Sequence, residues 1–189
     1  MNYPKRKRTR LKDFDYSQNG AYFITICTKD KKKVLGHIPI ASEFTVEQTT
    51  PCLPFANKNP SSQPTVGQAA PCLPHVHLSE WGKITEKYIL NIPKVYANAT
   101  VDTYVIMPNH IHMILCLTSN PSGRQEAACP TVSNIVRSIK ILARKEIGES
   151  IFQSSFHDHI IRNEQDYLET WKYIENNPAK WEGDSLYVK

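Results

Sequence analysis

The segment from residue 103 to residue 117 constrains the fold most strongly, because it predicts two adjacent strands joined by a tight turn. Residues 103–107 and 111–117 are rich in β-branched and other apolar side chains, and Pro108 and Asn109 between them are typical turn residues. Helix-length amphipathic patterns lie on both sides of this hairpin. A hairpin between two helices predicts a fold that mixes α and β elements.

Further elements are predicted from runs of β-type residues and from the helical spacing of apolar residues. In chain order they are a strand over 22–27, a short return strand over 33–38, a helix from an N-cap at Ser79 to Pro93, a helix from 130 to about 148 with Ile135, Ile139 and Leu142 on its core face, an extended piece at 160–161, and a helix over 164–177 ended by Pro178. This order matches a split βαβ, ferredoxin-like antiparallel sheet with an added C-terminal helix, an α+β fold.

Residues 39–76 interrupt this order. Seven of the 13 prolines lie there, and the segment has few charges and no strand or helix period. Its sequence also repeats, because Pro51-Cys52-Leu53-Pro54 recurs as Pro71-Cys72-Leu73-Pro74. A loop of this length is rare inside a compact core. We therefore expect residues 1–189 to form a single domain with a Pro-rich surface insertion at 39–76.

Positive charge is concentrated near the N-terminus. Residues 1–36 carry a net charge of +7 and the remainder a net charge of −2, which together give +5. Clustered Lys and Arg predict a polyanionic partner such as nucleic acid, and the alternative is a solvated basic tail. The candidate nucleic-acid contacts are this basic run and a basic stripe on the helix over 130–148, namely Lys5, Arg6, Lys7, Arg8, Arg10, Lys12, Arg137, Lys140 and Arg144.

The cysteines and the hydropathy argue against two other classes of protein. The chain has five Cys and no Cys-x-x-Cys pair, so a disulfide scaffold and a zinc ribbon are both disfavoured and a reducing cytosol is expected. No run of 18 apolar residues occurs, so no membrane partner is expected. The expected location is cytoplasmic and associated with the nucleoid.

A His-x-His pair lies inside the second strand of the predicted hairpin. Strand alternation puts His110 and His112 on one face, about 6.6–6.8 Å apart along the strand, so both could reach one cation. The alternative is two polar residues on the wet face of a half-exposed strand. Structural zinc is disfavoured because it needs four N or S ligands. His75 and His77 have the same spacing outside any confident strand and are not expected to bind metal.

The last predicted helix has a core face and an opposite polar side. The core face is expected from the spacing of Tyr167, Leu168, Trp171 and Ile174. Tyr173 points away from that face and shares its side with Asn177, one turn further on. It is either an ordinary exposed tyrosine or one kept for its hydroxyl.

The segment Met107-Pro108-Asn109-His110-Ile111-His112 resembles the HUH motif of single-tyrosine (Y1) transposases of the IS200-like group, and within that group the REP-associated tyrosine transposases. Residues 13–28, 78–84, 158–164 and 173–178 resemble, in the same order, further segments of that family. The resemblance covers about residues 10–38 and 77–182.

The resemblance implies the HUH fold and an enzyme that cleaves and rejoins hairpin-bearing, palindromic single-stranded DNA through a 5′-phosphotyrosine. It implies Tyr173 as the nucleophile, and His110, His112 and Asn177 as ligands of a divalent metal, Mg²⁺ or Mn²⁺. His159 is similar to a family histidine beside the active site and is not expected to be a ligand. Relatives in this family are monomers or homodimers, and the sequence leaves that choice open.

Two alternatives remain. One is a replication initiator or relaxase-type nickase of the same HUH superfamily, but initiators tend to carry Tyr-x-x-x-Lys, whereas Tyr173 is followed by Asn177. Relaxases place the tyrosine before the histidines. The other is a DNA-binding module that has lost catalysis, although the histidine pair and Tyr173 are intact.

Overall fold

A four-stranded antiparallel sheet forms the centre of the molecule in the computed structural model, which describes residues 14–39, 75–118 and 131–188. Its spatial order is β4-β5-β1-β6. These strands are β1 (Gly20–Cys27), β4 (Ala99–Ile106), β5 (His110–Leu117) and β6 (His157–Ile161). Numbered among themselves along the chain, they stand in the order 2-3-1-4, with all neighbours antiparallel. This is the split βαβ, ferredoxin-like arrangement, so the predicted fold class is confirmed.

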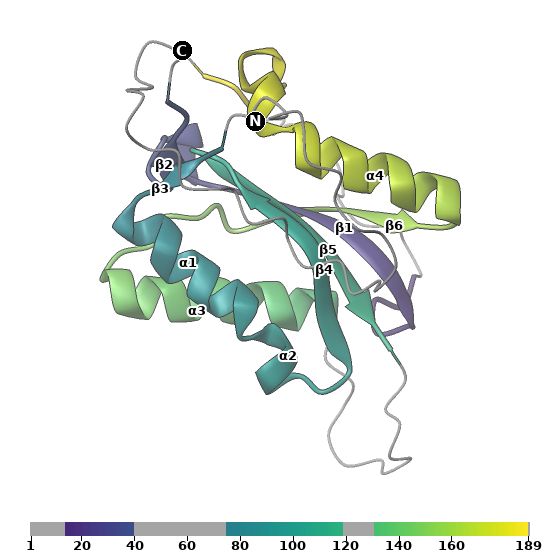
Figure 1. Ribbon diagram of the computed structural model, residues 1–189. Coiled ribbons are helices and arrows are strands. Elements are labelled where there is room, and N and C mark those ends of the chain that lie inside the picture. The colour runs from purple at the N-terminus through teal and green to yellow at the C-terminus, as the bar shows by residue number, and fades with distance from the viewer. Residues whose placement is uncertain (1–13, 40–74, 119–130, 189) are drawn as a thin grey trace, which may run out of the picture.

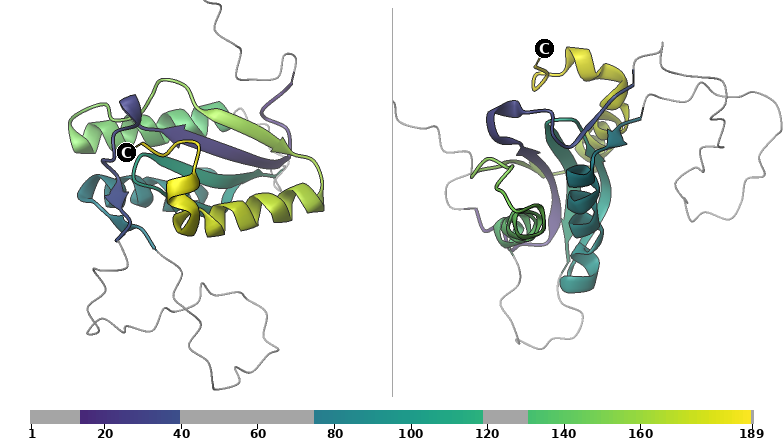
Figure 2. Two further views of the ribbon diagram at one scale, coloured as in Figure 1. Left: turned by 90° about the horizontal axis from the view of Figure 1, so that it is seen from above. Right: turned by 90° about the vertical axis from the view of Figure 1, so that its left-hand side faces the viewer.

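Helices cover both faces of the sheet. The connections between its strands contribute α1 (Glu80–Leu90), the short α2 (Ile92–Val95) and α3 (Val132–Ile147), while α4 (Glu164–Asn176) follows the last strand. In Figure 1 and Figure 2, α1 and α3 lie on one side of the sheet and α4 lies on the other. The sheet therefore has one face toward the main core and a second face toward α4.

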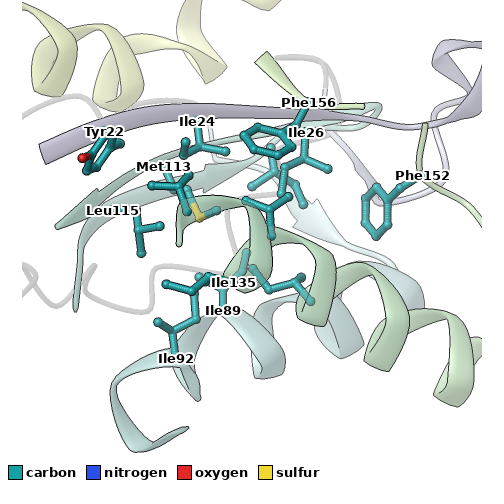
Figure 3. Close-up of a cluster of buried hydrophobic side chains, with 14 of the residues drawn as sticks. Tyr22, Ile24, Ile26, Ile89, Ile92, Met113, Leu115, Ile135, Phe152 and Phe156 are labelled. Carbon is teal, nitrogen blue, oxygen red and sulfur yellow. The ribbon is translucent and has the colours of Figure 1, made fainter. Parts of the chain in front are cut away.

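The two faces of β5 differ in chemistry. Met113 and Leu115 are fully buried and face α1 and α3 in the cluster that also contains Ile89 and Ile135 (Figure 3). Residues of β5 with even numbers point to the opposite face because strand side chains alternate. His112 and its neighbour at 110 therefore lie on the face that α4 covers.

Local capping explains where the long helices begin. The side chains of Ser79, Thr131 and Asn163 accept hydrogen bonds from the backbone N–H groups of Gly82, Asn134 and Asp166, respectively. Each cap satisfies one of the donors that a helix N-terminus leaves unpaired. The predicted N-cap at Ser79 is confirmed, and α3 ends at Gly148 with a φ of 90°, a backbone conformation that favours glycine.

Four details differ from the sequence-based expectation. The return strand is only β2 (Gly36–His37), and it pairs with β3 (His77–Leu78) outside the main sheet. Pro93 does not end a helix but stands in the first turn of α2, where its missing N–H leaves no helical bond unmade. Leu142 and Leu168, expected on core faces, are 39% and 45% exposed. The buried face of α3 includes Ala143 and not Leu142, and the buried face of α4 contains Thr170 and Ile174 and not Leu168.

Several expectations concern residues outside the described ones. The basic run from Lys5 to Lys12 and residues 40–74 of the Pro-rich segment belong to this group. Among the described helices, none has the length and apolar character that crossing a membrane requires.

Candidate active site

The histidine pair lies at the start of β5, against the covering helix α4. His110 and His112 are 0% and 3% exposed, so the alternative of two polar residues on a wet strand face is wrong. Their ring centroids are 4.4 Å apart. In the sheet, His110 is paired with Cys27 of β1 and His112 with Thr25. The backbone pairing of β1 and β5 therefore fixes the Cα positions from which the two imidazole side chains extend.

Hydrogen bonds at the inner ring nitrogens orient both imidazoles. His110 Nδ1 is 2.8 Å from Asn109 Oδ1, and His112 Nδ1 is 2.9 Å from Thr25 Oγ1. The amide nitrogen of Asn109 donates to two backbone carbonyls, those of Leu186 and Lys31, which leaves its Oδ1 as an acceptor. His110 Nδ1 must then carry the proton, and Nε2 offers a lone pair. Such outer hydrogen bonds are typical of histidines that bind metals.

A carboxylate and an amide complete the cluster. His110, His112 and Asp184 each offer one ligand atom, and these atoms all lie within 4.8 Å of one another. Asp184 follows the 3-10 helix Pro178–Gly183 (η3), and its Oδ1 accepts from the Leu186 N–H at 2.6 Å. Its Oδ2 accepts from Asn177 Nδ2 at 2.9 Å. The structure thus brings Asn177 to the histidine pair and adds Asp184, which the sequence did not predict.

Two buried atoms in this cluster have no hydrogen-bond partner within the described part of the chain: His110 Nε2 and Asn177 Oδ1. Both are acceptors when His110 is neutral, so they cannot bond to each other. A protonated His110 would donate to Asn177, which is one reason that this neighbour raises the pKa of His110. Buried acceptors left unpaired are costly, and a cation between them would satisfy both. The donor set therefore fits a divalent metal ion.

Burial keeps both imidazoles neutral. It lowers the pKa of His110 to about 4, against an opposing effect of the Asp184 carboxylate. Burial and the neighbouring His110 ring lower the pKa of His112 to about 3. Neutral imidazole is the form that binds metals, so both rings are ready to act as ligands at neutral pH.

Tyr173 reaches the same cluster from α4. It is 45% exposed, and its hydroxyl lies 3.4 Å from His112 Nε2 and 3.4 Å from Asp184 Oδ2. Phe23 stacks on the His112 ring with centroids 5.1 Å apart and meets the Tyr173 ring edge-on at 5.9 Å. The predicted tyrosine and the predicted histidines thus converge, with Phe23 packed against both rings.

Burial and a nearby carboxylate disfavour the phenolate form of Tyr173. Burial and the Asp184 carboxylate raise the pKa of Tyr173, while the Asn177 side chain has a smaller, opposing effect. Burial alone would raise the pKa of Asp184, but hydrogen bonds from the Leu186 N–H and from Asn177 hold it below its usual value. A cation bound beside Asp184 would offset the negative charge that disfavours the phenolate.

Two other side chains that sequence reasoning considered lie apart from this cluster. The Tyr167 hydroxyl donates to Asp102 Oδ2 at 2.8 Å and so ties α4 to β4. His159 lies on β6, and its Nε2 is 2.9 Å from a carboxylate oxygen of Asp166. His159 is not in the metal-ligand group found among the described residues, and Tyr167 is only partly buried.

The basic stripe of α3 lies on the other side of the sheet from α4 (Figure 1). Arg137 and Arg144 are exposed there. Lys140 Nζ donates to the backbone carbonyls of Gln153 and Ser155 at 2.9 and 2.7 Å, so it holds the chain after α3 in place. DNA that contacts this stripe would therefore have to extend around the sheet from the cluster.

The depressed histidine pKa values predict a pH-dependent stability. Below about pH 6.5 the unfolded chain protonates its histidines, whereas buried His110 and His112 stay neutral down to about pH 4 and 3. The unfolded state then binds more protons, so the free energy of unfolding of the metal-free protein falls as the pH drops from 7 to 5. Urea denaturation at several pH values measures this slope.

A matched pair of variants identifies the source of that slope. His110→Gln and His112→Gln each remove a buried titrating ring, and each is expected to flatten the pH dependence. An equal slope in wild type and in His112→Gln would contradict the assignment.

Comparisons with known proteins agree with this fold. No protein family model matches the chain. A protein of Haemophilus influenzae, described as an uncharacterized protein, is 31% identical over an alignment of 202 positions that covers 97% of this chain and 93% of that protein. The solved structure of a REP-associated tyrosine transposase bound to a REP hairpin superposes with a TM-score of 0.53 and 20% identity, over 91% of this chain and 74% of the other. The chain therefore belongs to one family with the Haemophilus influenzae protein and has the fold of the Y1 transposase-like proteins.

Proposed function

We propose that the protein is a transposase-type DNA transesterase that cleaves and rejoins hairpin-bearing single-stranded DNA through a 5′-phosphotyrosine intermediate. The observation that carries the proposal is the 3.4 Å distance from the Tyr173 hydroxyl to His112 Nε2, inside a cluster whose donor set fits a cation. A nucleophile placed beside metal ligands is the arrangement that phosphoryl transfer requires.

The metal ligands in this proposal come from β5 and from the end of α4. His110 and His112 would bind through Nε2 and Asn177 through Oδ1, with Asp184 as a further oxygen donor. Amide, carboxylate and water oxygens suit Mg²⁺, and the two imidazoles shift the preference toward Mn²⁺. When bound, such an ion supplies Lewis-acid activation of a phosphate oxygen.

Tyr173 carries the bond-making step. Its phenolic oxygen attacks phosphorus in line, the bond from phosphorus to the 3′-oxygen breaks, and the phosphate stays on the 5′ side as a tyrosyl ester. The released 3′-oxygen takes up a proton and becomes a 3′-hydroxyl. The phenolic proton passes to solvent, which reaches the 45% exposed Tyr173. The ester conserves the bond energy, so attack by a 3′-hydroxyl rejoins the strand without ATP.

The substrate class rests on charge and on the structural neighbour. That neighbour was solved with a REP hairpin, and the same fold in this chain supports a hairpin as the ligand. The basic run from Lys5 to Lys12 and the exposed Arg137 and Arg144 are the proposed backbone contacts.

Cleavage of a labelled oligonucleotide tests this function. We expect the full chain and Mn²⁺ to convert a hairpin-bearing single strand into a covalent protein–DNA adduct that retains a 3′-terminal label. A 5′-terminal label should leave as free DNA with a 3′-hydroxyl, and a chelator should suppress both products. If the DNA is bound but never cut with any divalent ion, the protein is a binding module.

The Asp184→Asn variant tests two effects of this carboxylate, one on metal affinity and one on the pKa of Tyr173. The variant loses a ligand charge, so we expect the Mn²⁺ concentration for half-maximal cleavage to rise about 10–100-fold. The same change removes a group that raises the pKa of Tyr173, so the pH profile of cleavage at saturating Mn²⁺ should shift to lower pH. Glu182→Gln, an exposed neighbour in η3, is the control. An unchanged Mn²⁺ requirement in Asp184→Asn would exclude Asp184 from the metal site.

A further inference from the structure

The second His-x-His motif acquires a partner in the folded chain. His77 lies in β3 directly opposite His37 of β2, and their ring centroids are 5.3 Å apart. His75 precedes β3 and stacks on the His77 ring at 4.7 Å. Three imidazoles thus meet on one side of a two-stranded ribbon, although His37 is 38 residues from His75 along the chain.

The backbone beneath these rings is tightly held. A Cβ added to Gly36 would press against the backbone carbonyl of His77, so the two strands approach as closely as glycine allows. The Ser79 N–H donates to Leu35 O at 2.9 Å, and its hydroxyl donates to Val34 O at 2.6 Å. These bonds fix the register that places His37 opposite His77, before any ligand binds.

The ring spacing matches a shared metal ion. Zn²⁺ binds imidazole nitrogen at about 2.0–2.1 Å in tetrahedral geometry, which places the centroids of two bound imidazoles roughly 5 Å apart. The observed 4.7 and 5.3 Å lie close to that value, but the rings stand at interplanar angles of 25° and 31°, so they must turn before their nitrogens can share one ion. All three side chains are exposed, which leaves their χ angles room to rotate the ring nitrogens toward a common point.

We propose that His37, His75 and His77 form a second metal site, for Zn²⁺ or a similar borderline divalent ion, with water in the remaining position. A cross-strand histidine added to a His-x-His pair supplies three imidazole ligands, a set found in zinc proteins. The site has no carboxylate or amide oxygen among its three donors, so it should reject Mg²⁺, unlike the cluster at His110.

Metal bound there would link the two ends of the segment that runs from β2 to β3. Each of these strands has only two residues, and a ribbon of that length contributes little stability alone. A ligand that binds only the folded state raises stability by mass action. The proposal is independent of the transposase function, because none of these histidines contacts the cluster at His110.

Equilibrium dialysis of the full, chelator-treated chain against Zn²⁺ tests the proposal. Wild type is expected to bind two Zn²⁺ ions, one at each cluster. His37→Gln and His77→Gln should each retain one ion and weaken the other by about tenfold or more. His157→Gln, an exposed histidine of β6, should retain both, and far-UV circular dichroism checks that each variant is folded.

The catalytic cluster supplies the second comparison. His110→Gln should lose the other ion while keeping the one that depends on His37. The proposal is overturned if wild type binds a single Zn²⁺ that only His110→Gln removes. It is equally overturned if His37→Gln and His77→Gln bind two ions with wild-type affinity.

Discussion

Tyr173→Phe is expected to abolish the covalent protein–DNA adduct, by ~10³-fold or more, while hairpin binding stays near wild type. The substitution removes only the hydroxyl that lies 3.4 Å from His112 Nε2. The phenyl ring can keep the packing against Phe23 and His112, so the fold and the histidine cluster should persist. Denaturing gels of labelled hairpin DNA measure the adduct, and a mobility-shift titration measures binding.

Tyr167→Phe is the matched control in the same helix. It removes the hydrogen bond to Asp102, which should cost about 1 kcal/mol of stability, and it leaves the site intact. The variant should therefore form the adduct wherever it is folded. An adduct in Tyr173→Phe, or its loss in folded Tyr167→Phe, would assign the nucleophile elsewhere.

His110→Gln and His112→Gln are expected to show the second large effect, a loss of Mn²⁺-dependent cleavage of ~10³-fold, because ion activation is worth several kcal/mol. Each imidazole presents Nε2 to the cluster, and each is held by one hydrogen bond at Nδ1. Glutamine can place its one amide group near the position of Nε2, but it has no second nitrogen at the position of Nδ1 and so cannot reproduce that pair of contacts. Cleavage rates over a Mn²⁺ titration measure the loss.

His159→Gln provides the control for these two variants. This histidine lies on β6 in a segment that resembles an active-site motif, but it pairs with Asp166 rather than with the cluster. Its Mn²⁺ dependence should match that of wild type. The metal assignment fails if His159→Gln loses Mn²⁺-dependent cleavage and His112→Gln retains it.

Local signals explain why much of the fold could be predicted. The turn at Pro108 and Asn109, the cap at Ser79 and the stop at Gly148 act within a few residues of the elements that they define. Strand alternation likewise put His110 and His112 on one face without any tertiary information. Helical spacing predicted the helices but not every buried position in them. Leu142 and Leu168 are exposed, because burial depends on which neighbouring elements cover each helix face.

The rest of the site depends on contacts between distant segments. Thr25 meets His112 only because β1 and β5 pair, and the two residues are 87 positions apart. Asp184 follows the short 3-10 helix η3, where no periodic pattern in the sequence marks it. Asn109 is the exception, since its place immediately before His110 was a readable signal. The pairing of His37 with His77 could not be predicted, because the sequence between them has no strand or helix pattern that would bring the two together.

Mass spectrometry of the trapped adduct tests the central claim most directly. Cleavage after Lys172 and Lys180 yields a peptide of residues 173–180 in which Tyr173 is the single tyrosine, and Tyr167 falls in the preceding peptide. After nuclease trimming, we expect a residual nucleotide joined through its 5′-phosphate to the 173–180 peptide. A nucleotide on any other tyrosine-containing peptide, or linkage through a 3′-phosphate, would contradict the proposed mechanism.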